Sequence, residues 1–129
     1  GGGPEAPVGI SVPQAMYDDF VKISEPIQKI RPDYPFEVKV REPRKRPTRM
    51  GGTDASVFAI EGVPTLGFTT EDFKGYDFDY GEIWHTERDL YTKNIPEYQE
   101  HTATVTAIIA LGVANLDKQL SREGLYTEE

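Results

Sequence analysis

The stretch GGTDASVFAIEGVPTLGF, residues 51–68, decides the fold class of this 129-residue chain. Thr53 or Asp54 is a suitable N-cap for a short helix, because such a side-chain oxygen accepts a hydrogen bond from the exposed first-turn amides. Gly62 then predicts the left-handed C′ residue that ends this helix. The apolar run 63–68 is typical of a short buried strand. A helix that leads directly into a strand indicates an α/β fold.

Upstream of this stretch, the sequence predicts a helix and then a strand. An amphipathic helix is indicated by apolar residues at steps of three and four, namely Met16, Phe20, Ile23, Ile27 and Ile30. Ser11 is the expected N-cap, and Pro26 predicts a kink or a restart inside the helix. Alternating apolar residues over 34–43 predict a half-exposed strand. Residues 1–12 indicate either a flexible lead-in or the end of a strand.

Downstream, residues 94–120 carry the strongest helix pattern in the chain, with Pro96 suited to the first turn. Residues 69–82 are acidic and aromatic without a clear period, which predicts a loop, and residues 83–91 continue it towards a short turn. Only two or three strands are available. The sequence therefore predicts an α/β fold with a mostly parallel sheet that belongs to a larger sheet or is completed by a partner.

The composition limits the classes of partner. Acidic residues outnumber Lys and Arg by 22 to 14, giving a net charge of −8, which argues against nucleic acid and anionic membranes as ligands. The chain has no cysteine, so disulfides and thiolate metal sites are excluded. It has no apolar run of about 18 residues that would span a membrane. These features predict a soluble domain, with a secreted or periplasmic location left open. The start GGGPEAPVG lacks a methionine and indicates an artificial junction, a processed end or a fragment.

A basic run, REPRKRPTR, occupies residues 41–49 of this otherwise acidic chain. Such runs are usually solvated loops. The second interpretation is a loop that contacts an anionic group near an acidic site. The sequence leaves both interpretations open.

Two further motifs carry a resemblance to a known family. The first combines a Thr-Asp pair, an apolar helix and a Gly-Val-Pro turn, and the second is an aromatic-His-Thr-x-x-Asp pattern followed by the long helix. Their residues are Thr53, Asp54, Phe58, Gly62, Val63 and Pro64, then Trp84, His85, Thr86 and Asp89. In this order and spacing they resemble the co-catalytic zinc exopeptidases. That family includes bacterial leucyl aminopeptidases, glutamate carboxypeptidases and related glutaminyl cyclases.

The resemblance implies a fold and roles for particular residues. The implied fold is a three-layer αβα sandwich, of which residues 1–129 would form the C-terminal portion of a single catalytic domain. His85 would be a zinc ligand, with Asp54 supporting the metal site and Asp89 bracing the histidine loop. Trp84 stands where the family usually has a tyrosine. It would lie near the oxyanion or line the substrate pocket, since its indole N–H can donate a hydrogen bond.

The chain also departs from the family pattern. It contains no upstream His-x-Asp, and its only Glu-Glu pair is at residues 128–129. The complete enzyme would hold two zinc ions, whereas this chain alone would bind zinc weakly or not at all and would be inactive. The implied partners are a peptide substrate and the upstream half of the same protein or another copy of the chain. The alternative is a non-catalytic peptidase-like domain that binds a peptide or a partner protein at an exposed strand.

Plainer interpretations of these residues remain open at this point. His85 can be a loop histidine bonded to a neighbour, Trp84 a packing residue and Asp54 a helix cap. The aromatic alternation over 76–80 can form a pocket wall. His101, the other histidine, is expected to face solvent near the start of the long helix.

Overall fold

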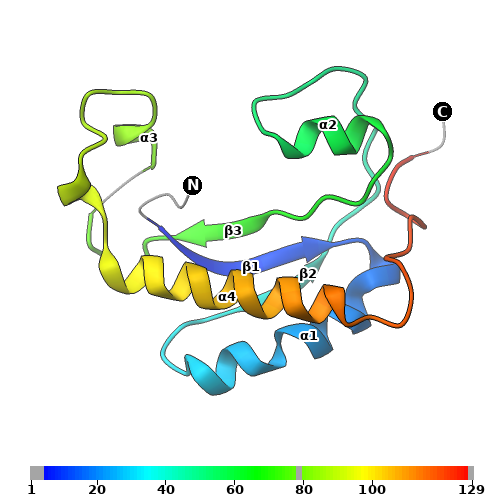
Figure 1. Cartoon of the computed structure of the whole chain (residues 1–129), viewed down its shortest axis with the longest axis horizontal. Coiled ribbons are helices and arrows are strands. Elements are labelled where there is room, and N and C mark those ends of the chain that lie inside the picture. The colour runs from blue at the N-terminus through cyan, green and yellow to red at the C-terminus, as the bar shows by residue number, and fades with distance from the viewer. Residues whose placement is uncertain (1–4, 78–79, 128–129) are drawn as a thin grey trace.

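The protein has a mixed α/β fold, described by a computed structural model over residues 5–77 and 80–127, except for the side chain of Tyr80. Its sheet has three strands in the order β2-β1-β3 (Figure 1). β1 (Ala6–Val12) is central and pairs in parallel with β2 (Glu37–Val40) and antiparallel with β3 (Phe68–Glu71). The α/β class and the partial sheet agree with the sequence prediction.

The N-terminal segment is the central strand of the sheet. Gly9 pairs with both neighbouring strands, and a methyl group at its Cα would lie 2.7 Å from the backbone oxygen of Glu37. Only glycine allows β2 to approach this closely. The apolar composition of β1 follows from its position, because a central strand is covered by neighbours on both sides.

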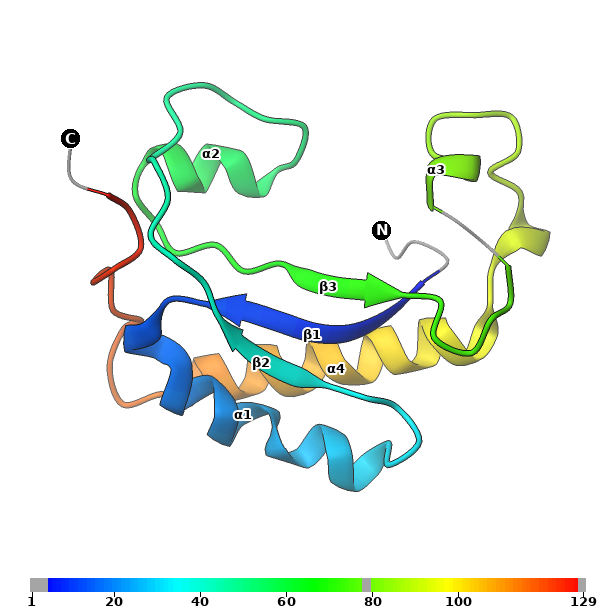
Figure 2. The same ribbon diagram turned by 180° about the vertical axis from the view of Figure 1, so that it is seen from behind.

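Two long helices, α1 (Tyr17–Ile30) and α4 (Pro96–Ala114), lie on the same face of the sheet (Figures 1 and 2). They approach closely at Gly112, where a methyl group would lie 2.3 Å from Cγ2 of Ile23. The core between sheet and helices consists of Ile10, Val12, Met16, Phe20, Ile27, Val38, Val105 and Ile109. Within the described part of the chain, no helix is both long enough and apolar enough to cross a membrane.

The start of α1 differs from the prediction. Ser11 lies in β1, aligned with Lys39 of β2, so it does not cap a helix. A 3-10 turn, η1 (Gln14–Met16), follows, and α1 begins only at Tyr17. Pro26 neither breaks nor restarts the helix, since α1 runs through it. Pro26 faces solvent while the opposite side of the helix is anchored in the core, which offsets the lost backbone hydrogen bond.

The sheet is mixed, not mostly parallel, because β3 runs antiparallel to β1. The predicted strand at 63–68 was also misplaced, since regular pairing begins at Phe68 and continues to Glu71. Pro64 has no amide to donate to a ladder, which disfavours pairing earlier in this run. α4 begins at Pro96 as predicted but ends at Ala114, short of residue 120. Asn115 is the C-cap residue, and asparagine is less favourable than alanine or leucine in a helix interior.

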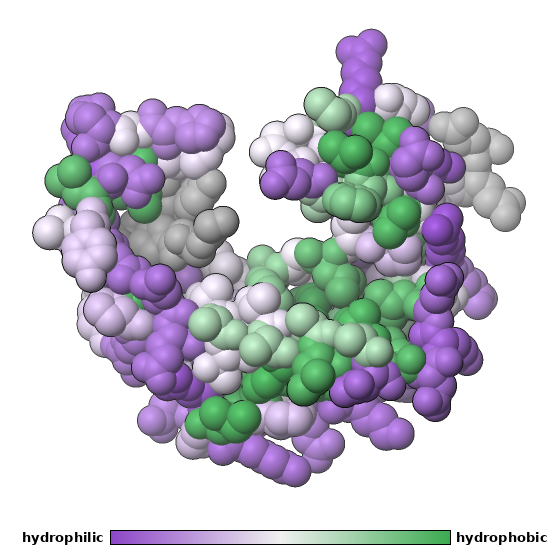
Figure 3. Space-filling view, in the orientation of Figure 1, coloured by the Kyte–Doolittle hydropathy of each residue, from purple (hydrophilic) through white to green (hydrophobic). Residues whose placement is uncertain are grey.

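Two small helical lobes lie beyond β3 (Figure 1). The α2 lobe, residues 48–62, contains α2 (Ala55–Ile60), and the α3 lobe, residues 80–94, contains α3 (Tyr80–Ile83) and the 3-10 turn η2 (Tyr91–Lys93). The space-filling view shows a hollow between the two lobes (Figure 3). The predicted site residues lie in these lobes, so the sheet and long helices act as their base.

Candidate functional site

His85 lies in the α3 lobe, immediately after α3, with an exposed imidazole. Its φ of 53° is in the left-handed region, which few residues other than glycine adopt. The ring stacks on Trp84, with centroids 4.2 Å apart and planes 20° apart. An exposed side chain held on a strained backbone is typical of functional positions. Trp84 itself is 54% exposed and packs against His85, outside the main core.

Thr86 braces the His85 loop. The Thr86 hydroxyl donates to the carbonyl of Ile83 at 2.9 Å and accepts from the amide of Arg88 at 3.2 Å. Asp89 joins this turn only through its amide, which donates to the carbonyl of Thr86 at 3.3 Å. Among the described residues its carboxylate forms no hydrogen bond or ion pair, so the Asp89 side chain is available to other groups.

The connection from the sheet to the α3 lobe is anchored by Asp72. Its carboxylate accepts from the Tyr98 hydroxyl at 2.8 Å and from the amides of Tyr76 and Asp77 at 2.9 and 2.7 Å. The Tyr98 hydroxyl in turn accepts from the amide of Lys74 at 2.9 Å. Burial raises the pKa of Tyr98 to about 12, and the bond to the Asp72 carboxylate adds to the shift. This network ties the segment before α3 to the first turn of α4.

Aromatic packing was expected to form a pocket wall here. Tyr76 packs edge-on against Tyr98, with ring centroids 5.3 Å apart, and so contributes to the anchor. Phe78 and the side chain of Tyr80, the other two residues of the alternation, lie outside the described residues.

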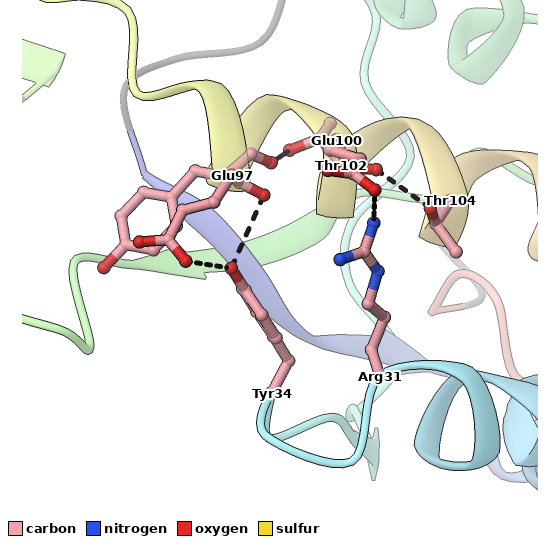
Figure 4. Close-up of polar contacts among 7 residues, drawn as sticks. Arg31, Tyr34, Glu97, Glu100, Thr102 and Thr104 are labelled. Atoms are coloured by element: carbon pink, nitrogen blue, oxygen red, sulfur yellow. Dashed lines mark hydrogen bonds and ion pairs between the residues drawn. The ribbon is translucent and has the colours of Figure 1, made fainter.

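A second set of bonds joins the turn after α1 to α4 (Figure 4). The Tyr34 hydroxyl donates to Oε2 of Glu97 at 2.9 Å, and Nζ of Lys74 reaches the same oxygen at 2.8 Å. These hydrogen bonds, that from Lys74 first, lower the pKa of Glu97. Arg31, at the end of α1, also forms an ion pair with Glu100 of α4. Polar contacts therefore join the turn after α1, and Lys74 ahead of the α3 lobe, to the N-terminal part of α4.

His101 is fully buried, so the expectation that it faces solvent was wrong. Its Nε2 lies 3.1 Å from the carbonyl of Pro7 and its ring stacks on Tyr34, with centroids 4.0 Å apart. Its Nδ1 has no hydrogen-bond partner among residues 5–77 and 80–127. Burial lowers the pKa of His101. A neutral ring that donates from Nε2 fits this environment, which makes His101 a structural residue. The signal was present in the sequence, since His101 lies on one helical stripe with Val105 and Ile109.

Asp54 precedes α2 in the other lobe. It occupies the N-cap position, but its backbone is helical and its side chain makes no capping hydrogen bond. Thr53 is linked to the helix only through its carbonyl, which accepts from the Ser56 hydroxyl at 2.7 Å. The Asp54 carboxylate is therefore exposed and makes no bond to the residues that the structure describes, which leaves it available to a ligand or a partner.

The structure keeps His85 and Asp54 in separate lobes on either side of the hollow (Figure 3). Across residues 5–77 and 80–127, no three His, Asp or Glu side chains come together to hold a metal ion. A zinc site needs three protein ligands or more. These residues therefore do not fit a metal site on their own, and any shell around His85 needs donors from other groups.

Both lobes expose large apolar side chains, and such surface often marks an interaction site. In the described part of the chain they are Met50, Val57 and Phe58 in the α2 lobe and Trp84, Leu90 and Tyr91 in the α3 lobe. Tyr91 is 91% exposed. These side chains are suited to contact with further protein or a substrate.

No protein-family model, curated protein or solved structure matches this chain.

Proposed function

We propose that this chain is the C-terminal portion of a zinc-dependent exopeptidase of the aminopeptidase type, which removes N-terminal residues from peptides. The observation that supports this most is His85, the histidine of the family-like motif. Its imidazole is exposed, its backbone is left-handed and its ring is held against Trp84. A metal ligand needs such an accessible and oriented ring nitrogen.

The chain's own residues would act as follows. His85 would supply one ring nitrogen, and the stacked Trp84 would restrict its rotation. The Trp84 indole N–H would donate to the oxygen that becomes negative during hydrolysis. Asp54, on the opposite lobe, would orient a ligand or the substrate amine through its exposed carboxylate. Zinc, when bound, polarises the scissile carbonyl and lowers the pKa of its water.

The remaining ligands and the general base would come from the upstream half of the same protein or from another copy of the chain. Two features support such a partner. β2 and β3 each pair with β1 alone in the described sheet, which leaves two strand edges open. Both lobes also expose large apolar side chains that a partner would cover.

The test is the zinc content and aminopeptidase activity of the intact protein. We expect His85→Ala to lose bound zinc and to reduce activity at least about 100-fold, in line with the loss of a metal ligand. Gln119→Ala is a suitable control because this side chain is exposed beyond the end of α4. Unchanged zinc in His85→Ala, with circular dichroism unchanged, would reject the ligand role.

A second candidate function is favoured by the open edge of β3 (Phe68–Glu71), which can accept a peptide as an added strand. In this case the chain would be a non-catalytic peptidase-like domain. Peptide binding that persists in EDTA and in His85→Ala would support it. Hydrolysis that requires zinc would support the exopeptidase instead.

A further inference from the structure

A pocket separate from the two-lobe hollow lies beneath the end of α2. It has a volume of about 820 Å³ and lies between the segment from Arg46 to Thr48, Ile60 at the end of α2 and the C-terminal segment from Arg122 to Thr127. Figures 1 and 2 both show the C-terminal segment beside α2. The pocket therefore joins three parts of the chain that are distant in sequence.

The walls of this pocket are built by specific contacts. Arg44 and Tyr126 form a parallel bridge, and the amide of Thr127 donates to the carbonyl of Arg44 at 3.0 Å. The Tyr126 hydroxyl donates to the carbonyl of Ala59 at 3.2 Å. Leu125 is only 1% exposed and fixes the C-terminal segment to the rest of the protein. The pocket is thus a formed feature of the fold.

Two guanidinium groups converge at one point of this pocket, above Gly62. A methyl group at the Cα of Gly62 would lie 3.5 Å from Cζ of Arg46 and 3.6 Å from Nη1 of Arg122. Gly62 has a φ of 73° and ends α2, and the amide of Val63 donates to the carbonyl of Phe58 at 3.1 Å. The predicted left-handed C′ glycine is confirmed, and both guanidinium groups lie within van der Waals distance of the position that a methyl group would take there.

Neither guanidinium is neutralised by the described residues. Arg46 donates from Nε and Nη2 to the carbonyl of Ile60, a neutral acceptor, with Nε at 2.7 Å. Arg122 makes no side-chain hydrogen bond or ion pair within the described part of the chain. Glu123 lines the same pocket but pairs with neither arginine there. Two like charges held together in an acidic protein favour an anion between them.

We infer that the Arg46–Arg122 pocket binds an oxyanion, a carboxylate or a phosphate group carried by a small ligand. A planar guanidinium matches both groups with paired hydrogen bonds. Arg46 keeps donors free after its bonds to Ile60, and Arg122 keeps its donors free of other side chains. This gives Arg46, a residue of the basic run at 41–49, a role in contacting an anion. The inference does not depend on the zinc proposal.

The test is titration calorimetry of the intact protein with inorganic phosphate and, separately, with succinate, each against chloride at equal ionic strength. We expect saturable binding of at least one oxyanion, a loss of at least about tenfold in affinity for Arg122→Gln and a gain for Glu123→Gln. Binding of one probe alone identifies the group as phosphate or carboxylate.

The control is Arg49→Gln, which removes an exposed charge from the same basic run without touching the pocket. We expect its affinity to equal that of the unchanged protein. An equal loss in Arg49→Gln, or equal heats with chloride, would show a general charge effect and overturn the inference. Absence of saturable binding by either oxyanion would overturn it as well.

Discussion

The helix-covered side of the sheet and the two lobes beyond β3 are held together by different forces. The first is an apolar core between β1, α1 and α4, with Phe20, Ile27 and Val105 fully buried. The lobes are held by hydrogen bonds instead, such as those of Thr86 and Ser56, and they leave large apolar side chains exposed. An apolar core makes a stable base by itself, whereas surfaces like those of the lobes usually gain stability from a partner. Substitutions should therefore lower the free energy of unfolding most in the sheet and long helices, and least in the lobes.

The largest effect is expected at Gly9 in the central strand. In Gly9→Ala the new methyl group would lie 2.7 Å from the backbone oxygen of Glu37, so β1 and β2 must separate. We expect the free energy of unfolding to fall by about 3 kcal/mol, the upper range for overpacking. Chemical denaturation measures this loss. Gly67→Ala is the matched control, because no atom lies within 4 Å of its added methyl group. Equal stability of the two variants would contradict the close strand approach.

A smaller loss is expected at the contact between α1 and α4. In Gly112→Ala the methyl group would lie 2.3 Å from Cγ2 of Ile23, a side chain that is able to shift because it is only partly buried. We expect a loss of about 1–2 kcal/mol. Ile23→Ala in the same protein should recover part of it, which a double-mutant cycle by denaturation would detect. Additive losses in the double variant would argue against this helix contact.

These two glycines also show what sequence patterns predict and what they miss. Periodicity identified α1 and α4 because a buried helix face repeats every three or four residues. It could not reveal Gly9 or Gly112, because close approach depends on which backbones meet. The central strand was likewise open to two interpretations, since Pro7 and Gly9 obscure the strand pattern of residues 6–12.

The candidate site was predictable only as motifs. The residues around His85 attracted attention through their order and spacing, yet no pattern predicted its left-handed backbone or its stacking on Trp84. The prediction for His101 was wrong because a histidine near a helix start usually faces solvent, whereas this one lies on the buried stripe with Val105 and Ile109. The proximity of Arg46 and Arg122 could not be predicted from the sequence. These two residues are far apart in the chain, and the Arg44–Tyr126 bridge brings their segments together.

Because His101 is buried, the stability of the sheet and long helices should depend on pH. Its pKa is lowered by burial, so below about pH 6.5 the unfolded chain binds a proton that the folded protein does not. Stability should therefore fall as the pH falls from about 6.5 towards the folded-state pKa, by at most about 1.4 kcal/mol per pH unit. In His101→Gln this part of the slope should disappear, whatever the stability at neutral pH. Denaturation curves between pH 5 and 8 would measure it, and an unchanged slope would exclude the buried neutral ring.

Loss of the Asp72–Tyr98 hydrogen bond should loosen the segment before the α3 lobe and leave the sheet folded. Tyr98→Phe removes the hydroxyl that donates to Asp72 and accepts from the amide of Lys74. We expect a loss of about 1 kcal/mol, with faster hydrogen exchange at residues 74–77 and unchanged exchange in β1. Tyr91→Phe is the control, since this side chain is 91% exposed in the same lobe. Equal acceleration of exchange in β1 would show that the lobe and the base unfold together.

The smallest effect on stability is expected at Asp54. Its replacement distinguishes a helix-capping role from a functional role. An N-cap residue replaced by alanine typically costs about 1 kcal/mol, through the lost bond to the first-turn amides. Asp54 makes no such bond, so Asp54→Ala should change the free energy of unfolding by less than about 0.5 kcal/mol. The same variant should reduce peptidase activity of the intact protein if the exposed carboxylate serves a ligand across the hollow. Thermal denaturation and an aminoacyl substrate assay measure the two effects. A clear loss of stability would show that Asp54 acts as a helix cap.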